Sequence, residues 1–187
     1  GEHEDSPVLA YWRTGEGEFH VAFDDELGEL SDTQKPLIFQ LNADQMLEVL
    51  EKAYEAEWVL LSIDSKSTFK ELEFYPLYRL FDVEVAAYFL GRLGSDKSLG
   101  AIGERFLTEV PAYQSLLEKV YFGTKGEGLD DDVAHYFEGQ VLHQLATTMG
   151  KQIHANGADD LSKNIEMPLI AVLAMMEKQG IKIDEQR

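Results

Sequence analysis

The run Trp58-Val59-Leu60-Leu61-Ser62-Ile63 is short and almost continuously apolar. Such a run is typical of a parallel β-strand that helices cover on both faces of its sheet. Before it, Asn42 and Gln45 stand at the spacing of a capping box, and the apolar residues that follow predict a helix over residues 43–55. After it, the pattern turns helical from Asp64 onward. A buried strand between two helices predicts an α/β domain.

Two β-prone runs lie closer to the N-terminus, at residues 8–13 and 18–23. The intervening Thr14-Gly15-Glu16-Gly17 contains glycine, so the three segments together predict an antiparallel hairpin. Beyond the buried strand the chain is expected to be helical. Asp82 is the N-cap candidate of an apolar helix that ends at Gly91. Further helices are predicted over residues 98–107, 111–121, 132–155 and 164–180.

Length and charge limit the classes of function. A chain of 187 residues with 44% hydrophobic residues is long enough for one core, so residues 1–187 are predicted to form a single domain. The 35 acidic residues exceed the 16 basic ones and give a formal charge of −19. Proteins gain affinity for a phosphate backbone from Lys and Arg, so we expect weak DNA binding by this domain or none.

Cysteine and long apolar segments are absent from the sequence. Zero cysteines exclude a disulfide scaffold and a thiolate metal site. The longest apolar run, residues 167–176, is shorter than the roughly 18 to 20 residues that span a bilayer, so no membrane segment is expected. The first six residues lack the basic start and apolar stretch of a signal peptide, which favours a cytoplasmic protein.

Three segments resemble, in order, parts of one family. Residues 165–184 carry Glu-x-Pro-Leu, Met-Glu and Gly-Ile-Lys-Ile-Asp; Ile63-Asp64-Ser65-Lys66 precedes a second stretch at residues 80–90; and residues 120–126 read Val-Tyr-Phe-Gly-Thr-Lys-Gly. The first resembles the segment that leads from the exonuclease domain into the polymerase domain of family A DNA polymerases. The second resembles the second 3′-5′ exonuclease motif, and the third a loop of the Gram-positive branch of DNA polymerase I.

This resemblance implies a ribonuclease H-like fold, an α/β domain with a mixed sheet flanked by helices. It implies a fragment of a longer polymerase that serves DNA replication and repair, with residues 164–187 leading toward the polymerase domain. The implied partners are the polymerase domain of the same chain and, through the parent enzyme, DNA.

Active members of the family hydrolyse the terminal phosphodiester with two divalent metal ions, which are held by carboxylates. In the second motif Asp64 matches the Asn position, but Thr68 stands where a metal-binding Asp is expected. In the third motif Tyr136 keeps the aromatic position, but Gln140 replaces the Asp. Since two carboxylates are replaced by neutral side chains, the sequence predicts that the domain is inactive and binds no cofactor. Such a domain would act as a structural spacer.

The first motif is ambiguous. Asp24 and Glu26 form an Asp-x-Glu after an apolar run, as the motif requires, but only 40 positions separate Asp24 from Asp64. That interval is too short for the further hairpin that the family places between the first two motifs. We therefore assign residues 8–23 to that hairpin, expect the first strand upstream of Gly1 or missing, and interpret Asp24, Asp25 and Glu26 as an acidic turn.

Other candidate sites are weak. Residues 24–32 do not form a calcium loop, because Gly28 falls at the fifth position instead of the sixth. Asp130-Asp131-Asp132 is interpreted as the start of a helix, where acidic residues meet the positive end of the helix dipole. His135 and His143 share a helix at a spacing unlike paired metal ligands and are expected at the surface.

Three alternatives stay open. The domain is an active exonuclease if Asp24, Glu26 and Asp64 assemble a reduced site for Mg²⁺ or Mn²⁺. It is a protein-interaction module if its acidic surface docks a basic protein. It is a stand-alone relative of the family if its reading frame ends near Arg187.

Overall fold

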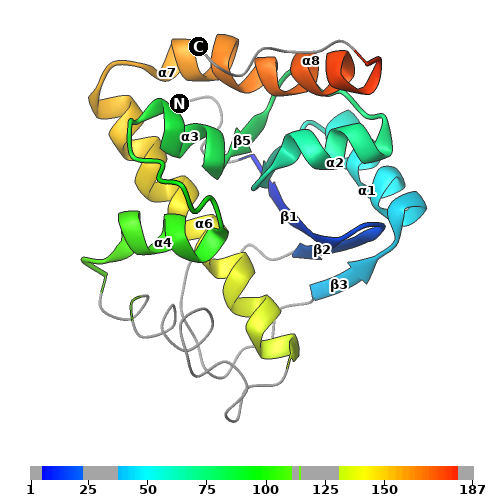
Figure 1. Cartoon of the computed structure of the whole chain (residues 1–187), viewed down its shortest axis with the longest axis horizontal. Coiled ribbons are helices and arrows are strands. Elements are labelled where there is room, and N and C mark those ends of the chain that lie inside the picture. Colours follow the sequence, from blue (N-terminus) through cyan, green and yellow to red (C-terminus); the bar gives the residue numbers. More distant parts are fainter. Residues whose placement is uncertain (1–5, 23–37, 111–113, 115–130, 181–187) are drawn as a thin grey trace.

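The structure is a computed structural model that describes residues 6–22, 38–110, 114 and 131–180, with the backbone alone at residues 131–134 and 136. Five strands form one sheet in the order β3-β2-β1-β4-β5 (Figure 1). The strands are β1 (Val8–Gly15), β2 (Glu18–Ala22), β3 (Ile38–Leu41), β4 (Val59–Ser62) and β5 (Leu80–Asp82). The helices are α1 (Ala43–Glu55), α2 (Ser65–Leu72), α3 (Val83–Phe89), α4 (Leu99–Leu107), α6 (Asp131–Ala155), α7 (Asp159–Leu161), a π-helix (Ser162–Glu166) and α8 (Met167–Lys178).

The sheet is mixed. β1, β2 and β3 pair antiparallel in succession, whereas β1 pairs with β4, and β4 with β5, in parallel. Helices flank the sheet, so the predicted fold class, a mixed α/β domain consistent with a ribonuclease H-like fold, is confirmed.

The first two strands of the sheet form the predicted hairpin. Residues 8–22 do form the predicted hairpin, but β1 itself lies between β2 and β4 and pairs with both. Among the described residues, β1 is thus the strand that lies beside β4 in the sheet. The expectation that the first strand of the family lies upstream of Gly1 or is missing stays a prediction.

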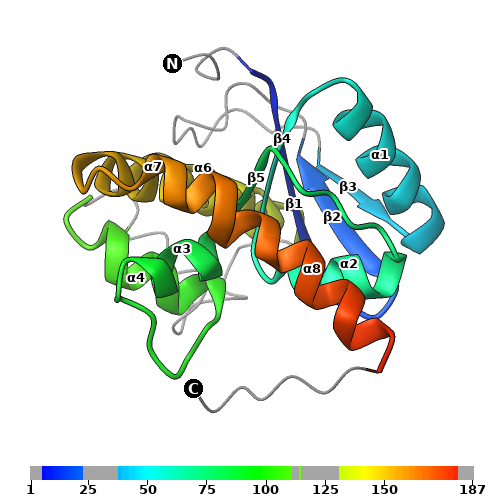
Figure 2. The ribbon, with the colours of Figure 1, turned by 90° about the horizontal axis from the view of Figure 1, so that it is seen from above.

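Neighbouring side chains of β1 point to opposite faces of the sheet. Tyr11 donates a hydrogen bond to Ser65 of α2, whereas a Cβ atom added at Gly139 of α6 would lie 3.4 Å from the ring of Trp12. Helices α1 and α2 therefore cover one face, and α6 covers the other (Figure 2). Gly139 lets α6 approach the sheet closely where the Trp12 ring lies.

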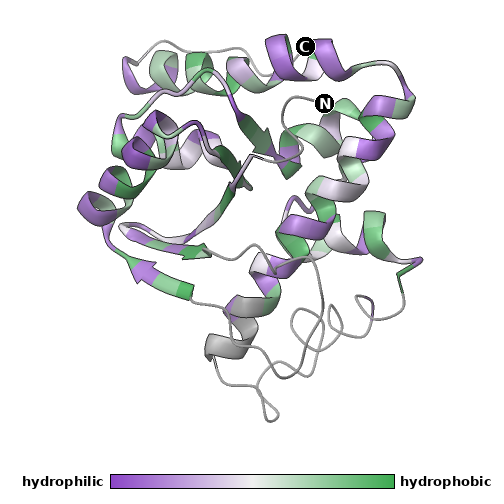
Figure 3. Ribbon diagram, turned by 180° about the vertical axis from the view of Figure 1, so that it is seen from behind, coloured by the Kyte–Doolittle hydropathy of each residue, from purple (hydrophilic) through white to green (hydrophobic). Residues whose placement is uncertain are grey.

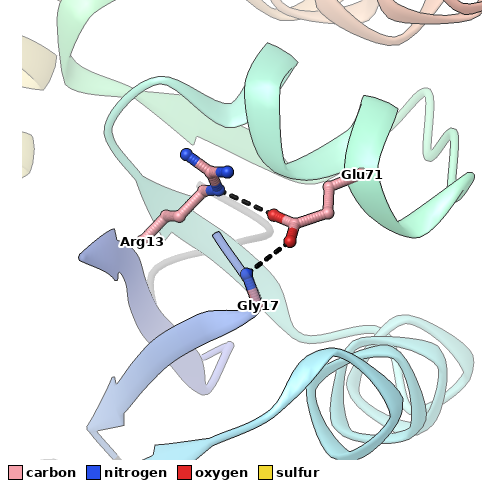
Figure 4. Close-up of polar contacts among 3 residues, drawn as sticks. All are labelled: Arg13, Gly17 and Glu71. Atoms are coloured by element: carbon pink, nitrogen blue, oxygen red, sulfur yellow. Dashed lines mark hydrogen bonds and ion pairs between the residues drawn. The ribbon is translucent and has the colours of Figure 1, made fainter. Parts of the chain in front are cut away.

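The turn of the hairpin is fixed to the C-terminal part of α2. The Glu71 carboxylate accepts hydrogen bonds from Arg13 Nε (2.7 Å) and from the backbone N–H of Gly17 (2.5 Å), as Figure 4 shows. Gly17 has a positive φ of 68°, which a glycine adopts without strain. The Glu71 carboxylate therefore pairs with the charge of Arg13 and also fixes the turn through its hydrogen bond from Gly17.

The core lies between the sheet and the helices on both faces. Figure 3 shows hydrophobic residues gathered on the strands at the centre of the sheet. Its largest fully buried side chains come from β1, β2, β4, α1, α2, α4 and α6, and include Tyr11, Phe19, Leu50, Phe69 and Leu142. In the part of the chain that the structure describes, no helix has the length and apolar character needed to cross a membrane.

Most predicted elements agree with the structure. The helix over residues 43–55 is α1, and both hydrogen bonds of its capping box form between Asn42 and Gln45 (2.9 and 3.0 Å). Asp82 and Ser98 cap α3 and α4. The short strands β3 and β5 were not predicted, and the last helical segment begins at Asp159 rather than near residue 164. The helix predicted over residues 111–121, the loop at residues 120–126 and residues 181–184 lie outside the described residues, apart from residue 114.

Candidate functional site

The parallel strands β4 and β5 end at the same edge of the sheet, and an acidic residue lies at or just beyond the end of each. Ser62 and Asp82 are register partners at the ends of the two strands. Asp64 lies two residues beyond Ser62, at the start of α2. Since ligands of α/β sheets bind outside the carboxyl ends of the strands, this edge is the candidate site.

Asp82 is almost fully buried, and its carboxylate holds the starts of two helices. Its Oδ2 atom accepts from the backbone N–H of Ser65 at 2.7 Å, while Oδ1 accepts from Glu84 (2.9 Å) and Val85 (3.1 Å). Burial raises the pKa of Asp82, and these hydrogen bonds oppose the rise. Its two oxygens are thus engaged by three backbone donors rather than presented to a cation.

Asp64 stands in the corresponding place before α2 but makes no capping hydrogen bond. Its backbone is left-handed, with φ 52° and ψ 49°, and its side chain is exposed. The first turn of α2 obtains its acceptor from Asp82 of the neighbouring strand instead. Asp64 therefore contributes charge to the site without being fixed by a hydrogen bond to the start of α2.

Glu84 is a carboxyl group of this edge whose pKa is shifted to near neutral pH. Burial, followed by the nearby carboxylates of Asp82 and Asp64, raises the pKa of Glu84 to about 7, and Lys97 and Lys66 act in the opposite direction. Near neutral pH Glu84 is thus close to half-protonated.

The same edge contains the buried hydroxyl groups of Tyr11, Ser62 and Ser65. Tyr11 is fully buried, donates to Ser65 Oγ at 3.4 Å, and has its pKa raised by burial, so it stays neutral. Ser62 is also buried and donates to the carbonyl of Ile63 at 3.3 Å. These groups supply neutral hydrogen-bonding atoms at the same edge as the buried Asp82 carboxylate.

Thr68 lies on α2 and is fully buried. Its hydroxyl oxygen has no hydrogen-bond partner among the described residues. A buried hydroxyl in this state costs about 1–3 kcal/mol, and burying a carboxylate at the same place without a partner would cost more. The residue at the predicted metal position is therefore both neutral and enclosed.

The third-motif residues lie on α6. Gln140 is fully buried, next to the Gly139 that contacts the β1–β2 face, and the Tyr136 side chain lies outside the described part. Since α2 and α6 cover opposite faces of the sheet, Thr68 and Gln140 approach it from opposite sides. Asp24, Asp25 and Glu26 lie outside the described residues.

Two histidines of α6, His135 and His143, are not simple surface residues, which corrects our expectation. The His135 ring stacks on the buried His20 at 3.9 Å between ring centroids, and His135 Nδ1 lies 3.0 Å from Glu138 Oε2. His143 is partly buried, and burial lowers its pKa. Both rings help to cover the core where α6 packs.

The donor set does not fit a two-metal centre in the part of the chain that the structure describes. There, no group of three or more His, Cys, Asp or Glu side chains is arranged to hold a metal ion. Of the carboxylates at this edge, Asp82 is saturated by backbone donors and Glu84 is partly protonated. Hard cations bind through carboxylate, carbonyl and water oxygens, and the Asp82 carboxylate of this edge is already held by backbone donors.

Sequence reasoning found Asp64 and Thr68 but missed the double role of Asp82 and the shifted pKa of Glu84. The signal for Asp82 was present, since it precedes an apolar helix and comes after a short apolar pair. Its bond to Ser65 joins residues that are 17 positions apart, so no local pattern predicts it.

These observations define a class by fold alone: a mixed α/β domain, consistent with a ribonuclease H-like fold, with an acidic edge at the ends of its parallel strands. No protein-family model, no curated protein and no solved structure matches the chain.

Proposed function

We propose that this chain is a 3′-5′ exonuclease-like domain of a DNA polymerase I that does not cleave DNA and acts as a structural spacer for the polymerase domain. The family assignment rests on the ordered sequence resemblances at residues 63–66, 80–90, 120–126 and 165–184. The parent enzyme is then a cytoplasmic DNA polymerase of replication and repair, and DNA is its substrate.

One observation carries the inactive assignment. At the edge of β4 and β5 the buried Asp82 carboxylate accepts from three backbone N–H groups, and the position expected to bind metal is the buried, neutral Thr68. Two-metal hydrolysis needs ionised carboxylates that clamp both ions, and a hydroxyl does not supply that charge. The remaining role is mechanical, with the rigid α/β core supporting the polymerase domain.

The test is incubation of the pure domain with a 3′-labelled oligonucleotide and Mg²⁺ or Mn²⁺. We expect no shortening of the oligonucleotide and no difference between the wild type and Asp64→Asn. Shortening that Asp24→Ala, Glu26→Ala or Asp64→Asn abolishes would establish the active alternative instead. Shortening that all three variants retain would point to a contaminating nuclease, and repurification would remove it.

The spacer role has its own test. The reading frame is expected to continue past Arg187 into polymerase motifs, and a stop codon there would leave a stand-alone domain. The isolated domain is expected to bind DNA more weakly than about micromolar at physiological salt, because its formal charge is −19.

A further inference from the structure

A groove lies between α3 and α8, beside the acidic edge; we call it the α3–α8 groove. Its apolar lining comes from Val85 and Tyr88 of α3, Leu93 beyond α3, and Leu169, Ile170 and Leu173 of α8. Figure 2 shows α3 and α8 as neighbours on the side of the sheet edge. Two helices from different parts of the chain thus form one apolar surface.

Several of these side chains are open to solvent. Tyr88 is 69% exposed and Leu169 is 42% exposed, and Ile165, one turn before Leu169, is 56% exposed. Leu169 and Leu173 stand four residues apart on α8, so they lie on the same side of that helix, and Ile165 of the preceding π-helix lies outside the groove lining. Contiguous exposed apolar side chains rimmed by charge mark sites of protein interaction.

Carboxylates outnumber lysines in the lining of the groove. Asp64, Glu84 and Glu166 line it together with Lys66 and Lys97. Lys66 donates to Glu177 at 3.3 Å, and Glu177 is not part of the lining. The lining carboxylates therefore exceed the lysines that face them, and a cation entering the groove would meet a favourable potential.

We propose that the α3–α8 groove binds a basic amphipathic helix of a partner protein. The apolar side of such a helix would lie on Leu169, Leu173 and Tyr88, in the helix-in-groove mode. Its Lys or Arg side chains would reach Asp64, Glu84 and Glu166, and one would lie over the exposed Tyr88 ring, whose face attracts cations. A second copy of this chain is a poor occupant, because both copies carry a formal charge of −19.

The pKa of Glu84 supports this assignment. Burial, followed by the carboxylates of Asp82 and Asp64, raises it, and Lys97 and Lys66 offset only part of the rise. A bound cation would lower the pKa of Glu84 and release a proton near neutral pH. Binding is thus expected to tighten as the pH rises from about 6 to about 8, because the carboxylate that meets the cation then becomes ionised.

The probe is a synthetic helix of about 18 residues with leucines at i, i+3, i+4 and i+7 and lysines on the other face. Two controls are a scrambled peptide of the same composition and an acidic peptide with Glu in place of Lys. Titration of the whole domain by calorimetry is expected to give one-to-one binding of the basic helix, about tenfold weaker binding of the scrambled peptide and none of the acidic one.

Variants of the groove separate specific docking from general attraction to an acidic protein. Leu169→Ser and Tyr88→Ala remove exposed side chains, so the domain is expected to keep its fold by circular dichroism and to lose about tenfold in affinity. Glu166→Gln is expected to weaken binding and flatten its salt dependence. The matched control is Glu51→Gln, an exposed residue of α1 outside the groove, which changes the net charge equally and is expected to leave affinity unchanged.

Equal binding of the scrambled peptide, or equal effects of Glu166→Gln and Glu51→Gln, would overturn the proposal, because attraction would then depend on net charge alone. A dimer of the domain that Leu169→Ser dissociates would also overturn it in favour of a second copy. The proposed groove does not depend on the proposed spacer role. Nuclease activity would refute the spacer role but would not affect the groove proposal. Loss of peptide specificity would refute the groove proposal but would not affect the spacer role.

Discussion

Asp64 and Asp82 each lie at the end of a parallel strand and each precede a helix, but their carboxylates have opposite surroundings. Asp82 is buried and accepts from three backbone donors, two at α3 and one at α2. Asp64 is exposed, left-handed and makes no capping bond. One carboxylate thus serves two helices, and the other remains available to a partner. The comparison separates a structural aspartate from a candidate binding residue.

The largest effect should come from removing the structural carboxylate. Asp82→Ala leaves the backbone N–H groups of Ser65, Glu84 and Val85 without their acceptor. Lost caps cost about 1 kcal/mol each and buried donors without partners about 1–3 kcal/mol, so we expect roughly 3 kcal/mol or more of lost unfolding free energy. Urea unfolding followed by circular dichroism measures it.

The matched pair is the same amide change at both positions. Asp82→Asn keeps one carbonyl oxygen but turns an NH₂ group toward a backbone donor, so it should lie between wild type and Asp82→Ala. Asp64→Asn tolerates the left-handed backbone and should stay within about 0.5 kcal/mol of wild type. Equal losses at the two positions would refute the distinction between them.

A smaller effect is expected at two buried hydroxyls, one in α2 and one at the end of β4. Thr68 Oγ1 has no partner in the described part of the chain, whereas Ser62 donates to the Ile63 carbonyl. Thr68→Val should leave stability unchanged or raise it by up to about 1 kcal/mol, since it removes a buried polar atom and keeps the shape. Ser62→Ala should lower stability by about 0.5–1.5 kcal/mol.

The two unfolding midpoints in urea decide this comparison. If Thr68→Val destabilises the domain as much as Ser62→Ala does, the hydroxyl of Thr68 has a partner and our description of α2 is wrong. Thr68→Asp, which places a carboxylate at the position where the second exonuclease motif has one, should be far more damaging than either, because Thr68 is fully buried and the new charge would be desolvated.

The smallest effect is the pH dependence that Glu84 adds to the acidic edge. Its pKa is about 7 in the folded protein, above its ordinary value of 4.5. The folded state therefore binds more protons between these values, so this group's stabilisation is complete below pH 4.5 and is lost as the pH rises through 7. Solvent screening keeps the change below about 1 kcal/mol.

Glu84→Gln should remove this slope and leave the domain slightly more stable than wild type at pH 8. Stability of both proteins measured at intervals from pH 5 to 8 tests it, and a carboxyl NMR titration locates the midpoint. A midpoint near the ordinary value would show that Asp64 and Asp82 do not act on Glu84, and that the edge is more solvated than the structure indicates.

Local patterns predicted much of the fold. The helix over residues 43–55 was found with its capping box, and Asp82 was found as a cap, because a cap involves residues within four positions of each other. Residue 98 was predicted only as the first residue of a helix, and the structure shows that Ser98 caps α4. The strands β3 and β5 were not found. They have four and three residues, too few for a period to emerge, and they become strands through pairing with β2 and β4.

The site was predicted less well than the fold, for a related reason. The sequence pointed to Asp64 and Thr68 by motif position, and the structure gives one an exposed place and the other a buried one. No sequence pattern distinguishes Glu84 from the other glutamates. Its pKa shift depends on burial and on Asp64, which is 20 positions away. Burial and long-range charge are properties of the packed chain.

The order of amino acids determined the strand at Val59–Ser62, the helices beside it, the negative charge and the neutral residues at two expected metal positions, because each of these is local or compositional. Packing alone placed β1 next to β4, put α2 and α6 on opposite faces, and brought Asp82 to the start of α2. Contacts between residues far apart in the chain form only when the whole core closes, and so they appear in the structure alone.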